Sequence, residues 1–149
     1  MNDTPTPVAV DSDLSALARI HATSFSEIWS AATLRDMLKT PGISAFSTLD
    51  GFVMMRVVAD EAEILTLAVT PDARGQGVGT VLLSVAVERA HHAGARAMFL
   101  EVGASNIPAR ALYSRFGFSE VGMRKTYYGG NEQGYSDWPT LADPLATDR

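Results

Sequence analysis

ILTLAVTPDARGQGVGT occupies residues 64–80 and predicts a strand, a glycine loop and the start of a helix in direct succession. Residues 64–70 are apolar or β-branched, as in a strand buried on both faces, and Pro71 ends the strand because it has no backbone N–H. A helix beginning near Val78 contributes unpaired N-terminal donors and the positive end of its dipole. Three glycines let the intervening backbone turn its N–H groups to one side, namely Gly75, Gly77 and Gly79. The stretch therefore predicts a phosphate-binding loop.

The glycine spacing separates this loop from the two commonest nucleotide-binding loops. A mononucleotide P-loop needs a Lys-Ser/Thr pair after its last glycine, and a dinucleotide-binding turn needs the spacing G-x-G-x-x-G. Neither pattern occurs between Arg74 and Thr80. The alternative is that the glycines only make a tight connection from strand to helix. The strand, proline and arginine before the loop and the amphipathic helix after it favour phosphate binding.

The amino-acid composition limits the kinds of protein that this chain can be. The 149 residues are 46% hydrophobic and 19% charged, which predicts one globular domain over residues 1–149 with flexible ends at 1–9 and 140–149. A net charge of −5 and the lack of basic runs argue against direct nucleic-acid binding, whereas a basic peptide would suit this charge. The absence of cysteine excludes a disulfide framework, a thiolate metal site and a cysteine nucleophile.

No targeting or metal-binding segment is predicted. The N-terminal residues lack the basic and apolar regions of a signal peptide, and no window approaches the roughly 20 apolar residues of a membrane span. We therefore expect a cytoplasmic protein with no membrane partner, and the sequence leaves its oligomeric state undetermined. His91 and His92 are adjacent on a predicted helix end and point in different directions, so we expect no metal site there.

The hydrophobic pattern predicts an α+β fold with a mixed sheet. Helix 11–24 would be capped by Asp11 or Ser12, and Asp50-Gly51 suits a hairpin turn. Pro139 would interrupt any strand near residues 135–138. The remaining expected elements are helix 31–39, strands 43–49 and 52–59, a helix from Val78 to about His92, strand 97–102, helix 109–116, and strand segments 118–121 and 123–127 separated by Gly122.

Several side chains in these elements are candidates for chemistry. Glu101 lies inside an apolar strand, where a carboxylate is costly unless it is paired, hydrated or protonated; a buried ion pair is the structural alternative. Tyr113 shares one face of the helix that follows with Leu112 and Phe116, as an ordinary core residue would. Asn106 can cap that helix. We expect His21 to be a packing or capping residue, and Phe25 and Trp29 to anchor a loop or border a substrate groove.

A set of motifs from about residue 61 to 128 resembles the GNAT N-acetyltransferase family. Arg74 to Gly79 looks like the family's pyrophosphate loop R/Q-x-x-G-x-G/A. Read with this loop, the chain resembles the ribosomal-protein-alanine N-acetyltransferases, the RimI type. The other matching segments are Leu100-Glu101-Val102, Ser105-Asn106, Ala111-Leu112-Tyr113, Gly117-Phe118 and Tyr127-Tyr128, with weaker support from His21, Phe25 and Trp29-Ser30.

The resemblance implies a GNAT fold with a mostly antiparallel central sheet flanked by helices, and acetyl-CoA as cosubstrate without a metal. Glu101 matches the family's general base, acting through water, and Tyr113 matches its general acid. The residues implied in cosubstrate binding are Leu67, Ala68, Val69, Arg74, Gly75, Gln76, Gly77, Val78, Gly79, Thr80, Asn106 and Tyr113. The implied reaction is direct transfer of acetyl to the N-terminal amino group of a protein, such as a ribosomal protein, since no cysteine is available for an acetyl-enzyme.

Two departures from the family pattern bear on the acceptor. Gly103 stands where relatives usually have arginine, and only Asp137 of the segment Ser136-Asp137-Trp138-Pro139 fits the family's closing strand. Two other functions therefore stay open. One is acetylation of a small amine or a lysine side chain by the same fold, and the other is a non-catalytic acyl-CoA-binding module.

Overall fold

A computed structural model of the chain describes residues 4–25, 27–102, 106–124 and 138–142. Its elements follow along the chain as β1 (Thr6–Pro7), α1 (Ser15–Ala22), α2 (Ala31–Leu38), β2 (Ile43–Ser47), β3 (Gly51–Val58), β4 (Glu61–Val69), the 3-10 helix η1 (Pro71–Ala73), α3 (Val78–His92), β5 (Ala97–Glu101), α4 (Ile107–Arg115), β6 (Ser119–Arg124) and β7 (Trp138–Ala142).

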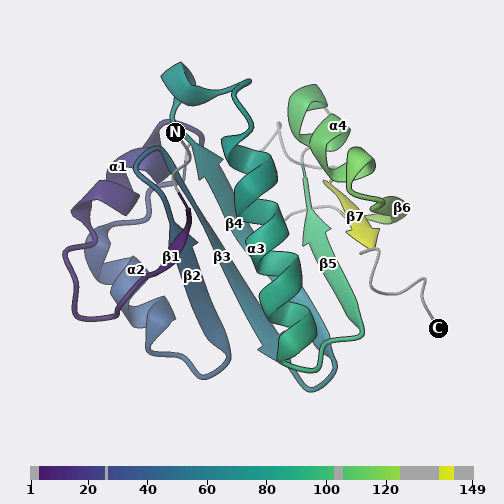
Figure 1. Ribbon diagram of the computed structural model, residues 1–149, viewed down its shortest axis with the longest axis horizontal. Coiled ribbons are helices and arrows are strands. Elements are labelled where there is room, and N and C mark those ends of the chain that lie inside the picture. The colour runs from purple at the N-terminus through teal and green to yellow at the C-terminus, as the bar shows by residue number, and fades with distance from the viewer. Residues whose placement is uncertain (1–3, 26, 103–105, 125–137, 143–149) are drawn as a thin grey trace.

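The strands form one mixed sheet in the order β1-β2-β3-β4-β5-β7-β6. β4 and β5 pair in parallel, and every other described pair of neighbours is antiparallel. A parallel pair needs a crossover connection, and here η1, the glycine loop and α3 supply it (Figure 1). The expected α+β fold with a mostly antiparallel sheet is confirmed.

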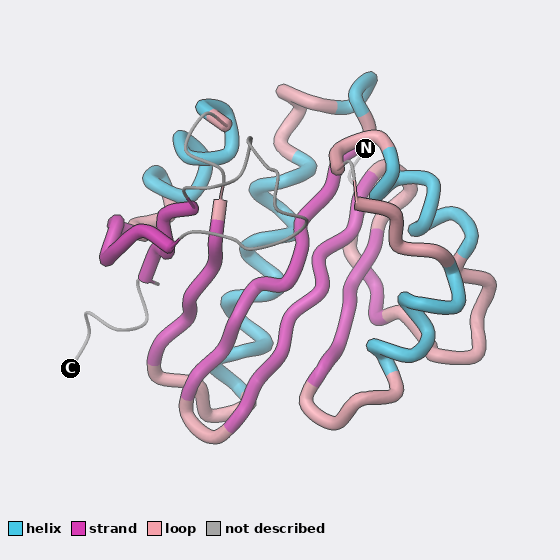
Figure 2. Tube along the Cα trace, turned by 180° about the vertical axis from the view of Figure 1, so that it is seen from behind, coloured by secondary structure: helices cyan, strands magenta, loops and turns pink. Residues whose placement is uncertain are grey.

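Helices cover both faces of this sheet (Figures 1 and 2). On one face, Leu82 and Leu83 of α3 and Tyr113 of α4 join a buried cluster with side chains of the central strands. On the other face, Leu17 of α1 and Leu34 of α2 pack against a second cluster. Side chains alternate between the faces along β3, which therefore contributes to both clusters.

The predicted strand, loop and helix at residues 64–80 are confirmed. β4 ends at Val69, α3 begins at Val78, and Gly77 at the helix N-cap has a φ of 88°, a value that side chains disfavour. The short helix η1 was not predicted. The hairpin between β2 and β3 is also confirmed, although Gly51 belongs to β3 and not to the turn.

Two expectations about the ends of elements are wrong. Neither Asp11 nor Ser12 caps the first helix, because α1 begins at Ser15, whose amide donates to the Asp13 carboxylate at 3.0 Å. Pro139 lies within β7, where it is tolerated because β5 ends opposite Thr140 and leaves the proline paired with β6 alone. The segments 1–9 and 140–149 include β1 and part of β7, which pair in the sheet, and the flexibility of these ends stays a prediction.

The connection from α1 to α2 is held by stacked rings. The His21 ring is 2% exposed and stacks on Phe25 and Trp29, with ring centroids 4.6 and 4.4 Å apart. This geometry agrees with His21 as a packing residue and with the two aromatic residues as anchors of the connection. Burial lowers the pKa of His21, and the charge of Glu27 opposes this shift.

The lowered pKa of His21 predicts a pH dependence of stability. The unfolded chain binds a proton at this histidine near pH 6.5, and the folded chain binds it only at lower pH. The free energy of unfolding should therefore fall as the pH drops below about 6.5. Thermal unfolding at pH 8 and pH 5.5 measures this loss, and His21→Phe, which keeps an aromatic ring in the stack, should show a smaller loss. Equal losses in the two proteins would contradict the expectation.

Candidate functional site

The central sheet opens between β4 and β5. The two strands pair only at Glu61 with Ala97, Ala62 with Met98 and Glu63 with Phe99, although β4 continues to Val69 and β5 to Glu101. Figure 1 shows the two strands parting toward the end that carries the glycine loop and α4. Among the described residues, no strand pairs with this edge of β4 beyond Glu63, next to the segment that the sequence predicts to bind a ligand through its backbone.

The register of β4 on β3 shows which backbone groups face this opening. The amide of Thr70 donates to the Asp50 carbonyl at 2.8 Å, and Val69 stands opposite Gly51. Hydrogen-bonded and non-hydrogen-bonded positions alternate in an antiparallel pair, so Ala68 bonds to β3 while the N–H and C=O groups of Leu67 and Val69 point away from it. The opening can therefore accept an extended chain at Leu67 and Val69, and not at Ala68.

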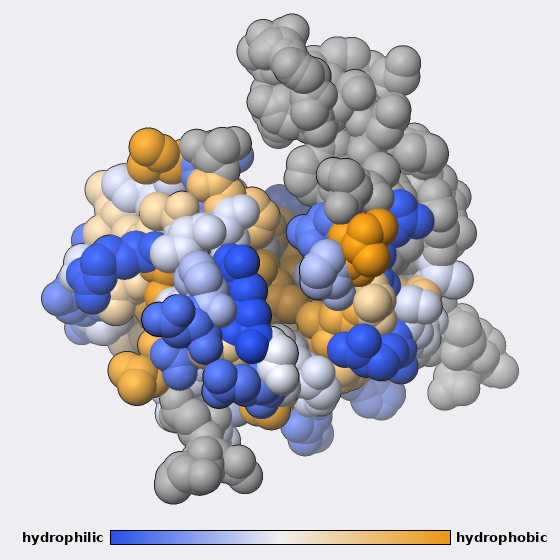
Figure 3. Space-filling view, turned by 90° about the horizontal axis from the view of Figure 1, so that it is seen from above, coloured by the Kyte–Doolittle hydropathy of each residue, from blue (hydrophilic) through white to orange (hydrophobic). Residues whose placement is uncertain are grey.

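A cleft of about 540 Å³ occupies this opening. Figure 3 shows it from above as a hollow whose floor is apolar, between a wall that carries the glycine loop and a wall formed by α4. The residues that line it are Ser24, Phe25, Leu67, Val69, Ala73, Arg74, Gly75, Gly77, Val78, Gly79, Thr80, Asn106, Pro108, Ala109, Ala111, Leu112, Tyr113 and Arg115.

The glycine loop presents backbone donors to the cleft. Gly77, the N-cap of α3, has no side chain to accept a bond from the first turn of the helix. The N–H groups at the start of α3 therefore lack an intrahelical or capping partner and are available to an anion. Gly79 packs closely, because a Cβ there would lie 3.3 Å from Leu112 of α4.

The charge of the cleft differs from that of the whole chain. The chain has a net charge of −5, yet the lining contains Arg74 and Arg115 and no aspartate or glutamate among the described residues. Arg74 is held on both sides, since its Nε donates to the Val69 carbonyl at 3.1 Å and its Nη2 to Ser24 Oγ at 3.0 Å. A polyanionic ligand with an apolar arm fits this donor set.

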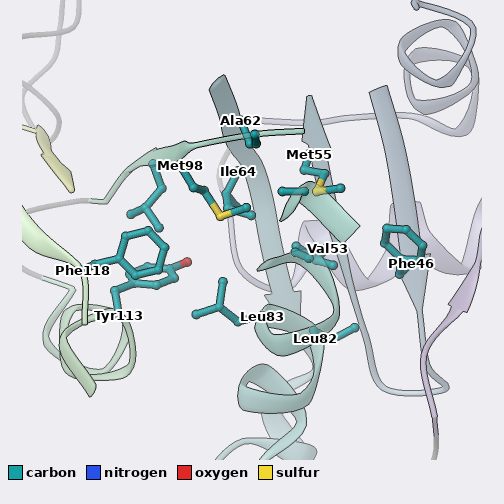
Figure 4. Packing of buried hydrophobic residues seen from close by; sticks show 14 of the residues in the cluster. Phe46, Val53, Met55, Ala62, Ile64, Leu82, Leu83, Met98, Tyr113 and Phe118 are labelled. Carbon is teal, nitrogen blue, oxygen red and sulfur yellow. The ribbon is translucent and has the colours of Figure 1, made fainter. Parts of the chain in front are cut away.

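Tyr113 stands where the cleft meets the core. The residue is 6% exposed, and its ring makes an edge contact with Phe118 at a centroid distance of 5.9 Å. Figure 4 shows its hydroxyl pointing away from α4, toward Ile64 and Leu83. Burial raises the pKa of the Tyr113 hydroxyl, so it stays protonated through the neutral range and can act as a donor.

Glu101 lies at the end of β5 and does not line the cleft. Its neighbours Leu100 and Val102 are buried in the cluster under α3 and α4, so the alternation of side chains directs Glu101 to the opposite face of the sheet. The carboxylate is half-buried there and has an interaction with the rest of the protein. Tyr113 and Glu101 therefore approach the opening between β4 and β5 from its two faces.

Asn106 has a structural role that the sequence left open. Its side chain accepts a hydrogen bond from the Ala109 amide at 3.2 Å and caps α4. The residue also lines the cleft, so the capping role is established while ligand binding stays a prediction.

The structure brings most of the predicted site together. The predicted residues that line the cleft are Leu67, Val69, Arg74, Gly75, Gly77, Val78, Gly79, Thr80, Asn106 and Tyr113. Ala68, Gln76 and Glu101 do not line it, and the Gln76 side chain donates to the Asp72 carbonyl at 3.2 Å instead. Sequence reasoning missed Ser24 and Arg115, because neither belongs to a recognisable motif. Phe25, which the sequence places either as a loop anchor or beside a substrate groove, also lines the cleft.

Two negative observations apply to the described part of the chain. There, no group of three or more His, Asp or Glu side chains is arranged to hold a metal ion. Among the helices in the same ranges, none combines the length and the apolar character that a membrane span requires.

Sequence comparison relates the chain to one enzyme family. The profile of the Acetyltransferase (GNAT) family matches residues 14–118. The ribosomal protein bS18-alanine N-acetyltransferase of Escherichia coli K12 is 33% identical over 128 residues, covering 86% of each chain. The protein of the same name from Salmonella typhimurium has the same identity and coverage.

Structural comparison gives the same relation. The crystal structure of the ribosomal-protein-alanine N-acetyltransferase from Escherichia coli superposes with a TM-score of 0.79 at 30% identity, covering 97% of this chain and 96% of that one. NAA60 of Arabidopsis thaliana, solved in complex with acetyl-CoA, superposes with a TM-score of 0.79 at 22% identity, covering 93% and 96%. At that identity the second likeness concerns the fold alone.

Proposed function

The chain belongs to the acetyltransferase (GNAT) family, and from this premise we propose that it transfers acetyl from acetyl-CoA to the N-terminal amino group of a protein. The observation that carries the proposal is the parting of β4 from β5, which opens a cleft between the outward backbone groups of β4 and the glycine loop. At this opening, a thioester could bind from one face of the sheet, and an amine could approach it from the other face.

The residues of the cleft suit coenzyme A in each of its parts. The pantetheine arm is a thin chain with two amides, and the outward N–H and C=O groups of Leu67 and Val69 would pair with it as a neighbouring strand does. The diphosphate would bind at Arg74 and the N–H groups around Gly77. When bound, acetyl-CoA supplies an acetyl group activated as a thioester.

Glu101 and Tyr113 would divide the proton transfers between them. Glu101, on the face opposite the cleft, would accept the proton of the attacking amine, directly or through a water molecule. Tyr113 would return a proton to the thiolate of coenzyme A. Burial in the same apolar cleft would raise the pKa of that thiol as well, so the thiolate would be a stronger base. The protein contains no cysteine, so transfer would be direct and not through an acetyl-cysteine.

An N-terminal amino group is the acceptor that this machinery fits best. Its pKa of about 7.7–8.0 leaves roughly a tenth of it neutral at pH 7, whereas lysine, with a pKa near 10.4, is almost wholly protonated. A single carboxylate is therefore a sufficient base. The relatives at 33% identity are named as N-acetyltransferases for alanine of ribosomal protein bS18, which supports a protein as the acceptor.

An acceptor panel tests the proposal. We expect a peptide beginning Ala-Arg to be acetylated with a kcat/KM at least about tenfold above that of free lysine or small amines, because its amine is neutral more often at pH 7. Mass spectrometry of the peptide locates the acetyl group on the α-amino nitrogen. Turnover of a small amine without turnover of the peptide would favour the small-amine alternative. Tight CoA binding without any transfer would favour a non-catalytic module.

The two departures from the family pattern do not enter this proposal. Gly103, Ser136 and Asp137 lie outside the described residues. Tyr127 and Tyr128 lie outside them too, as does Ser105. The bearing of Gly103 and Asp137 on the choice of acceptor stays a prediction from the sequence.

A further inference from the structure

We infer that Ser24, at the end of the first helical segment, is a positioning residue for the diphosphate-binding part of the cleft. The inference rests on the proposed use of coenzyme A and assigns a role to a residue outside the motifs of the glycine loop. Its basis is the hydrogen bond from Arg74 Nη2 to Ser24 Oγ, 3.0 Å long, between residues that are 50 positions apart in the chain.

The Arg74 guanidinium is fixed by two acceptors from different elements. Nε donates to the carbonyl of Val69, the last residue of β4, and Nη2 donates to Ser24. Both Arg74 and Ser24 line the cleft. A guanidinium carries more N–H donors than these two bonds use, so it can hold both contacts and still donate to an oxygen of a bound phosphate.

Fixing this side chain matters because Arg74 is otherwise mobile. Arg74 is exposed, and a free arginine side chain loses considerable rotamer freedom when it is immobilised on a ligand. The two bonds restrict that freedom before the ligand arrives, and preorganisation of this kind strengthens binding. Without the Ser24 hydroxyl, the guanidinium would keep its hydrogen bond to Val69, but the orientation of its two terminal nitrogens would no longer be fixed.

Ser24 is itself held in place by the folded core. Its amide donates to the His21 carbonyl at 3.0 Å, and the amide of Phe25 donates to the same carbonyl at 3.1 Å. The His21 ring is buried in the aromatic stack with Phe25 and Trp29. The hydroxyl that orients Arg74 is thus attached to the connection between α1 and α2, which the core holds in place, and not to the loop that binds the phosphate.

The test measures binding and needs no acetyl transfer. Titration calorimetry gives the Kd of coenzyme A, and displacement titration gives the Kd of pantetheine, which lacks the diphosphate. Ser24→Ala should raise the Kd of coenzyme A by about fivefold, the typical net effect of one hydrogen bond, and leave that of pantetheine within about 1.5-fold. Ser24→Thr, which keeps a hydroxyl, should stay within about twofold of wild type for both ligands.

A double-mutant cycle assigns the effect to Arg74. In the Arg74→Ala background, Ser24→Ala should cause no further change in the Kd of coenzyme A, because the guanidinium that it orients is gone. Ser114→Ala, which removes an exposed hydroxyl of α4 outside the cleft lining, is the matched control and should bind both ligands as wild type does.

Three results would overturn the inference. These are an unchanged Kd of coenzyme A in Ser24→Ala, an equal rise in the Kd of pantetheine, and a Ser24→Ala effect that persists in the Arg74→Ala background. Failure of the wild-type protein to bind coenzyme A at all would be a different result, because it would overturn the proposed function and this inference with it.

Discussion

Glu101→Gln is expected to lower kcat for an N-terminal peptide by about 10²-fold and to leave the Kd of coenzyme A within about twofold of wild type. The amide has nearly the shape of the carboxylate but cannot accept the proton of the attacking amine. Glu101 lies outside the cleft lining, on the opposite face of the sheet, so its replacement should not disturb the cosubstrate. Steady-state kinetics and calorimetry measure the two effects separately.

The pH profile distinguishes loss of the base from a general loss of activity. An α-amino group loses its proton near pH 8 without help, so the activity of Glu101→Gln should rise more steeply between pH 7 and pH 9 than that of wild type. Glu88→Gln removes an exposed carboxylate from α3 and serves as the matched control, with wild-type kinetics expected. A kcat of Glu101→Gln equal to that of wild type would leave the general base to another group.

Gly77→Val is expected to raise the Kd of coenzyme A by more than about 50-fold. Gly77 has a φ of 88°, a conformation that is an outlier for a β-branched residue. No atom lies within 4 Å of the place where a Cβ would stand, so the effect would come from the backbone and not from a clash. The loop would re-form with its N–H groups turned away from the diphosphate, and calorimetry with coenzyme A measures the loss.

The other end of the same helix supplies the control for Gly77→Val. Gly94 has a φ of 95° and equally open surroundings, but it follows the C-terminus of α3 and does not line the cleft. Backbone strain of about 1–2 kcal/mol should lower the melting temperature of Gly94→Val by a few degrees, as it should in Gly77→Val. The Kd of coenzyme A should be unchanged in Gly94→Val. Equal weakening of binding in both variants would mean that overall stability, and not the loop geometry, controls the affinity.

The parts of the fold that were predictable depend on local rules. Residues 64–80 predict a buried strand, a loop and a helix because an apolar run, glycines and a proline each favour a particular local backbone conformation. The start of α1 was misplaced because the prediction relied on Asp11 or Ser12 as a capping side chain, whereas the helix begins at Ser15 after Leu14, a residue that no capping rule identifies. The position of β7 between β5 and β6 was not predictable, since it depends on pairing between strands far apart in the chain.

The candidate site shows the same division. The loop residues follow from the motif, and their convergence with Tyr113 follows from the family resemblance. The direction of the Val69 and Ala68 backbone groups needed the register on β3, and the contact of Arg74 with Ser24 needed the packing of α1 against the sheet. The face of Glu101 could have been deduced, because strict alternation in the strand separates it from Leu100 and Val102.

Where β4 parts from β5, the sheet has an exposed strand edge in its interior, in addition to its two outer edges. Exposed strand edges invite pairing with other chains and so promote aggregation, and proteins usually cover, shorten or charge them. Here the glycine loop and α4 flank the edge, so its backbone groups lie inside a cleft and not on the outer rim of the sheet. A polypeptide strand would have to bring its side chains between these two walls, whereas the pantetheine arm carries only small substituents. We therefore expect this edge to favour pairing with a ligand over pairing with another chain.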